Sequence, residues 1–162
     1  MNVPVGSVVE NCVEIAGFNL QSKAVELSRK GFSGYIALTI EGHTGIEEGL
    51  ILFRNGEITG SVYEFLKLGQ VFFSGDALQL SANASRALHG IVDVIELSKQ
   101  QAELVIAFND KMGFERPVQA KDLSRLMQSI YDIELVKKFV GGKLRKEESK
   151  LDILKRIGLK EI

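Results

Sequence analysis

The segment GLILFRNGEITG, residues 49–60, carries the strongest turn signal in this chain. Asn55 and Gly56 stand between two strand-like runs, and both residue types tolerate the positive φ of a type I′ turn. The pattern predicts a β-hairpin whose strands cover Gly49 to Arg54 and Glu57 to Glu64.

Segments on the amino-terminal side of this hairpin predict one more strand and a helix. Residues 35–40 alternate in the manner of a half-buried strand. Before them, Asn19 is a suitable N-cap for a helix, and Gly31 is suited to the left-handed conformation that ends one. Residues 9–15 fit a strand and an early helix equally well, and both interpretations stay open at this point.

Three further segments on the carboxyl-terminal side of the hairpin have regular patterns. Residues 75–88 place apolar side chains on one helical stripe, with Ser74 as the expected cap. Residues 91–97 alternate in the manner of a fourth strand. The capping box Ser98-Lys99-Gln100-Gln101 predicts a helix that reaches about Lys111.

The chain beyond residue 115 differs in pattern and in charge. Arg116-Pro117 marks a break, Gly141-Gly142 is a candidate joint, and helical patterns cover residues 122–131, 133–140 and 146–157. Residues 1–115 contain 8 Lys and Arg against 14 Asp and Glu, whereas residues 116–162 contain 12 against 7. The sequence thus predicts an acidic part followed by a basic part.

These patterns together predict an α+β fold in two parts. Residues 1–115 are expected to form an α+β domain, an antiparallel β-meander of about four strands with helices packed on one side. Residues 116–162 are expected to form a basic helical C-terminal extension.

Two groups of side chains in this extension are candidates for interaction. The last helical pattern is short and amphipathic, so it has little stability alone in water and is expected to dock on its own domain, on a second copy or on a partner. A solvated helical face is the simpler explanation of the charges. The basic candidates are Lys137, Lys138, Lys143, Arg145 and Lys146, and the apolar candidates are Leu151, Leu154 and Ile157.

The residues that usually carry chemistry do not form a recognisable motif, and the sequence assigns no catalytic, cofactor-binding or metal-ligating residue. The chain contains only Cys12, His43 and His89 as potential imidazole or thiolate ligands. A metal cluster of His43 with Glu47 and Glu48 is one interpretation, but a polar loop beside a strand explains these residues more simply. Because adjacent strand residues point to opposite faces, the two glutamates do not suggest an acid/base pair. We therefore expect a protein that is not an enzyme.

Composition bears on the compartment of the protein. Hydrophobic residues make up 45% and charged residues 25% of the chain, which is typical of a globular protein. No apolar run approaches the length of a membrane span, and the N-terminus lacks the pattern of a signal peptide. The single Cys12 excludes an internal disulfide and favours a reducing compartment. We therefore expect a cytoplasmic protein that does not enter a membrane.

Several short blocks resemble a family of uncharacterised archaeal proteins, a domain of unknown function. The blocks are Pro4-Val5-Gly6, the strand entry at residues 31–35, the acidic-Gly strand at 48–53, the helix start at 75–78, the pair Leu97-Ser98 and Phe108-Asn109, and the end peptide at 151–159. Residues 19–90 are also distantly similar to the PatA amino-terminal (PATAN) domain of bacterial response regulators. That resemblance implies an interaction or signalling-adaptor role rather than catalysis.

Three functions are compatible with these sequence patterns. The first is a protein-interaction or signalling-adaptor module with a protein partner or a second copy of itself. The second is a small-ligand sensor, which requires an apolar pocket of at least about 300 Å³. The third is a nucleic-acid accessory protein that uses the basic C-terminal residues, whose binding would weaken with salt.

Overall fold

The computed structural model describes residues 3–143 of the chain. The chain divides into two compact units, residues 1–131 and 132–162. None of the described helices is both long enough and apolar enough to cross a membrane.

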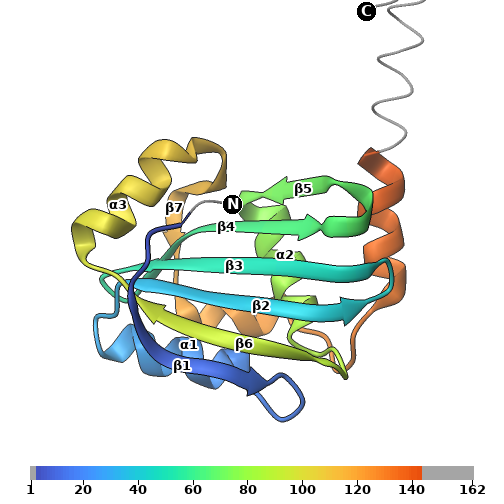
Figure 1. Ribbon diagram of the computed structural model, residues 1–162, viewed down its shortest axis with the longest axis horizontal. Helices are drawn as coiled ribbons and strands as arrows, with labels where there is room; N and C mark the ends of the chain where they lie inside the picture. Colours follow the sequence, from blue (N-terminus) through green and yellow to red (C-terminus); the bar gives the residue numbers. More distant parts are fainter. Residues whose placement is uncertain (1–2, 144–162) are drawn as a thin grey trace, which may run out of the picture. The chain divides into compact units, whose positions relative to one another are not determined.

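Within the described residues, seven antiparallel strands form one sheet in the first unit, with the order β1-β6-β2-β3-β4-β5 (Figure 1). β7 pairs with the first half of β4, whereas β5 pairs with the second half. The strands are β1 (Ser7–Glu14), β2 (Gly34–Gly42), β3 (Gly45–Arg54), β4 (Glu57–Phe65), β5 (Gln70–Phe73), β6 (Gly90–Glu96) and β7 (Gly113–Val118).

The antiparallel α+β fold is confirmed, but the prediction of about four strands is wrong. β5 has only four residues, which is too short to show a period. β7 contains Pro117, which a sequence pattern assigns to an edge or to no strand at all. β1 contains most of residues 9–15, for which the sequence left a strand and an early helix equally open. Its mostly exposed side chains give no clear alternation.

The hairpin at Asn55-Gly56 is confirmed, because it joins β3 and β4 with both turn residues at positive φ, 51° and 81°. Gly56 has a second constraint from packing. A Cβ on Gly56 would lie 2.4 Å from the backbone oxygen of Ser28, at the end of the first helix. The turn therefore needs glycine both for its backbone conformation and for close contact with that helix.

Three α-helices accompany the sheet: α1 (Leu20–Arg29), α2 (Ser74–Ala84) and α3 (Lys99–Phe108). The Asn19 side chain accepts a hydrogen bond from the Ser22 N–H, and Ser98 and Gln101 form the predicted capping box. α2 ends at Ala84 and α3 at Phe108, earlier than the predicted ends at 88 and about 111. Three short 3-10 helices follow strands or helices: η1 (Leu66–Leu68), η2 (Asp110–Met112) and η3 (Ala120–Arg125).

Helices lie on both faces of the sheet, not on one side as predicted. On one face, Gly49 of β3 comes so close to α2 that a Cβ there would lie 2.7 Å from Ser81 Oγ. Figure 1 shows α1 and α2 behind the sheet in that view. On the opposite face, Val105 of α3 packs in one core cluster with Leu50 and Leu52 of β3. Both faces of β3 are therefore buried at this end of the sheet.

The part of the chain after residue 112 differs most from the sequence prediction. The boundary predicted between residues 115 and 116 falls inside β7, which pairs with β4. The helix predicted over residues 122–131 is wrong, because only the 3-10 helix η3 forms there. In the second unit, residues 133–143 are helical, so the prediction for 133–140 is confirmed, but Gly141-Gly142 belongs to this helix rather than to a joint.

Candidate functional site

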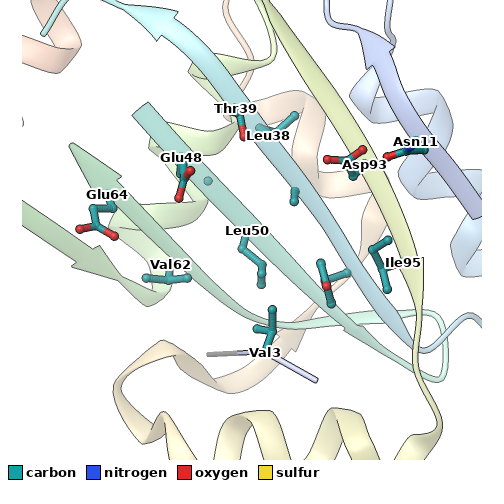
Figure 2. Close-up of a pocket in the computed structure, with 13 residues that line it drawn as sticks. Val3, Asn11, Leu38, Thr39, Glu48, Leu50, Val62, Glu64, Asp93 and Ile95 are labelled. Carbon is teal, nitrogen blue, oxygen red and sulfur yellow. The ribbon is translucent and has the colours of Figure 1, made fainter. Parts of the chain in front are cut away.

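A pocket of about 350 Å³ opens on the sheet face that carries α3 (Figure 2). Its lining comes from β2, β3, β4 and β6, with one residue from the N-terminal segment and one from β1. The lining residues are Val3, Asn11, Tyr35, Ala37, Leu38, Thr39, Glu48, Gly49, Leu50, Val62, Glu64, Asp93 and Ile95. We call this pocket the sheet groove.

The strand register explains why the floor of the sheet groove is apolar. Ala37 of β2 stands opposite Leu50 of β3, and Leu50 stands opposite Val62 of β4. Two positions away from Ala37 on β2, Tyr35 stands opposite Ile95 of β6. Because strand residues alternate between faces, these side chains project from the same face of the sheet. Ala37, Leu50 and Val62 form an apolar row across three strands, and Tyr35 and Ile95 extend the apolar floor to β6.

Carboxylates border this apolar floor. Glu48 of β3 stands directly opposite Glu64 of β4, and Asp93 of β6 stands opposite Ala37. Figure 2 shows Glu48 and Glu64 on neighbouring strands, with Asp93 beside Asn11 across the groove. Asp93 Oδ1 accepts a hydrogen bond of 2.7 Å from the Cys12 N–H. The groove is thus apolar in its centre and acidic at its edges.

α3 and its neighbours close one end of the groove and leave the other end open. Tyr35, Leu50 and Val62 belong to a buried cluster that also contains Val105 and Met112. At the other end, Glu48 is exposed to solvent.

Burial beside Asp93 raises the pKa of the Tyr35 phenol, with loss of hydration as the larger cause and the Asp93 charge as the smaller one.

A second polar cluster lies on the opposite face of the β3–β4 hairpin from the sheet groove, around the fully buried Glu47. Glu47 Oε2 accepts a hydrogen bond of 2.7 Å from the Tyr63 hydroxyl, and Oε1 accepts bonds of 3.2 Å from the Thr44 N–H and hydroxyl. The Tyr131 hydroxyl lies 3.1 Å from both carboxylate oxygens and accepts a bond from the His43 N–H. This carboxylate therefore links the β2–β3 turn to β4 and to the end of the first unit.

The tyrosines of this cluster titrate at high pH. Burial raises the pKa of Tyr63 well above 10, and the negative charge and hydrogen bond of Glu47 add to the shift. The pKa of Tyr131 is also raised, chiefly by burial. Both phenols therefore stay protonated in the folded protein at pH values where an unfolded chain loses these protons.

We expect the free energy of unfolding to fall as the pH rises above about 10, since the unfolded state then binds fewer protons than the folded state. Each buried tyrosine adds about 1.4 kcal/mol per pH unit to the fall of the free energy of unfolding with pH. Urea unfolding at a series of alkaline pH values should show a smaller slope for Tyr63→Phe than for the unsubstituted protein. Parallel slopes for the two proteins would contradict the assignment of Tyr63 as a buried titrating group.

The metal cluster considered for His43, Glu47 and Glu48 does not form. Glu47 is buried on the α2 face, whereas Glu48 is exposed and lines the sheet groove on the other face. His43 and His89 are both exposed. Among residues 3–143 the structure contains no group of three or more His, Cys, Asp or Glu side chains arranged to hold a metal ion.

The interaction residues predicted in the C-terminal part lie only partly within the described chain. Lys137 and Lys138 are exposed on the helix over residues 133–143, and Lys137 forms an ion pair of 2.9 Å with Glu134. Lys143, the last described residue, is half-buried. The remaining predicted residues, Arg145, Lys146, Leu151, Leu154 and Ile157, lie outside the described residues.

Sequence reasoning named an apolar pocket as the requirement of a small-ligand sensor but did not identify the residues of the sheet groove, although a signal for them was present. The run Leu50-Ile51-Leu52-Phe53 is apolar at every position, which indicates a strand with both faces buried rather than one. Glu48 and Glu64 interrupt strands at positions where charged residues are uncommon. Reading the apolar run and the strand carboxylates together would have pointed to a second, partly open apolar face.

Comparison with known proteins gives a family for this chain. The model of the family described as "Uncharacterized protein conserved in archaea (DUF2226)" matches residues 1–109. This match covers more than half of the chain, so the chain belongs to that family. Searches among curated proteins and among solved structures found no match.

Proposed function

We propose that this member of the archaeal family is a non-enzymatic interaction module that binds an amphipathic polypeptide segment in its sheet groove. The observation that carries the proposal is the apolar row of Ala37, Leu50 and Val62, which α3 covers at one end only. A concave pocket with an apolar floor and a few polar groups at its edges is typical of binding sites. The similarity of residues 19–90 to PATAN domains that the sequence predicts would imply the same role.

The groove offers space for a few apolar side chains rather than for a whole domain. Its volume of about 350 Å³ lies at the low end of ligand sites, and its floor is built on strands, which hold side chains in fixed places. An amphipathic segment with two or three apolar residues on one face would bury them on this floor and keep its polar residues in water.

Ala37→Phe is the substitution that tests this proposal, because it fills the centre of the groove with a side chain that strands accept well. The probe is a synthetic amphipathic peptide of leucine and glutamine. We expect this peptide to shift the backbone amide signals of β2, β3 and β4 in nuclear magnetic resonance spectra, and Ala37→Phe to weaken its binding at least about tenfold.

Ala107→Phe is the matched control, since Ala107 is exposed on α3 and does not line the groove. This variant should bind the peptide like the unsubstituted protein. Thermal unfolding of both variants checks that the fold is kept. The proposal would be contradicted if the peptide shifted amide signals only of residues outside the groove, or if both variants lost binding equally.

A small-ligand sensor is the second candidate function, because the volume of about 350 Å³ meets the minimum that such a site requires. A ligand of that kind would compete with the peptide for the groove and would shift the same amide signals. The nucleic-acid role rests on basic residues of which only Lys137, Lys138 and Lys143 are described, and it stays a prediction from sequence.

A further inference from the structure

Resting on the proposed function, we infer that the partner segment of the sheet groove is basic: an amphipathic stretch of a partner protein in which Lys or Arg flanks the apolar residues. Three carboxylates, Glu48, Glu64 and Asp93, and no basic side chain line the groove.

The three carboxylates are not neutralised by ion pairs within the described part of the chain. Its salt bridges involve Glu10, Glu26, Glu103, Asp122 and Glu134 as the acidic partners, and none of them lines the groove. Glu48 and Glu64 form a like-charged pair directly across two strands, an arrangement that costs stability. A cationic group placed between them would remove this repulsion.

The spacing of the carboxylates favours a polypeptide over a small cation. Glu64 lies on β4 and Asp93 on β6, and β3 and β2 lie between these strands. Three inter-strand spacings amount to about 14 Å, a distance that a single amine does not span. Two basic side chains on successive turns of a helix, or on an extended segment, reach both edges while apolar residues between them contact Leu50 and Val62.

Charge is tested with three synthetic peptides that share their leucine positions and carry Lys, Gln or Glu elsewhere. We expect the full-length protein to bind the Lys peptide at least about tenfold more tightly than the Gln peptide, with the Glu peptide weakest. The double variant Glu48→Gln/Glu64→Gln should lose about tenfold in affinity for the Lys peptide and little for the Gln peptide. A higher salt concentration should weaken the binding of the Lys peptide alone.

The control double variant is Asp110→Asn/Glu115→Gln, which removes two exposed carboxylates outside the groove and changes the net charge equally. It should bind the Lys peptide like the unsubstituted protein. Asp93 is left unchanged because it accepts the Cys12 hydrogen bond.

Several results would overturn the inference. Equal affinities for the Lys and Gln peptides would do so and would leave the proposed function intact, whereas absence of any peptide from the groove would remove the proposed function itself. Displacement of the Lys peptide by spermidine at equal concentration would indicate a small organic cation. Tighter binding of the Lys peptide by the full-length variant Leu151→Glu/Leu154→Glu would identify the chain's own C-terminal segment as the occupant.

Discussion

Glu47→Ala is expected to lower the free energy of unfolding by about 3–5 kcal/mol, a large part of the stability of a domain of this size. The substitution leaves the buried Tyr63 hydroxyl and the Thr44 N–H without their acceptor, and it removes the contact with Tyr131. A buried donor that loses its partner costs more than the bond itself contributes. Urea unfolding at neutral pH measures the change as a lower denaturation midpoint.

The neighbouring residue provides the matched control for this experiment. Glu48 is exposed and has a like charge opposite it, so Glu48→Ala should change stability by less than about 0.5 kcal/mol. Tyr63→Phe should give an intermediate loss of about 1–3 kcal/mol, because it removes one donor and leaves the carboxylate with the others. Equal effects of Glu47→Ala and Glu48→Ala would show that Glu47 does not hold the cluster together.

Phe53→Ala is expected to lower the free energy of unfolding by about 3–5 kcal/mol, through lost burial and the cavity that it leaves. Phe53 is fully buried, and its ring meets Phe32 edge to face at 5.9 Å with an interplanar angle of 72°. Phe32 follows α1, so the cavity would open where the hairpin meets that helix. Thermal and urea unfolding measure the loss.

Phe108→Ala is the control for Phe53→Ala, because Phe108 is 83% exposed at the end of α3. A change of less than about 0.5 kcal/mol is expected for this variant. A loss below about 1 kcal/mol for Phe53→Ala would mean that the surroundings of Phe53 collapse into the cavity, which would contradict close packing around this ring.

Local sequence signals predicted the parts of the fold that depend on local geometry. Asn55-Gly56 and Ser98 act through backbone conformation and hydrogen bonds within a few residues, so their turn and cap could be identified without knowledge of the fold. The same reasoning failed for residues 122–131, where a helical pattern was present but a 3-10 turn formed. There, contacts with the rest of the unit outweigh local preference.

The apolar run of β3 indicated a second buried face, but the full lining of the sheet groove depends on pairs that are distant in sequence. Tyr35 stands opposite Ile95, and Asp93 accepts a hydrogen bond from the Cys12 N–H across 81 positions. No periodicity within a window of a few residues encodes such contacts. The alternation of residues 35–40 in β2 and of residues 91–97, most of which form β6, did indicate which residues share a face, but not which strand lies beside them.

The strand order has a consequence for how this chain folds. β2, β3 and β4 pair with their neighbours along the chain, so they can form from contacts that are close in sequence. β1 pairs only with β6, whose first residue, Gly90, comes long after β1 ends at Glu14. Contacts of such wide separation form slowly. During synthesis, β1 therefore has no strand to pair with until the ribosome has released β6.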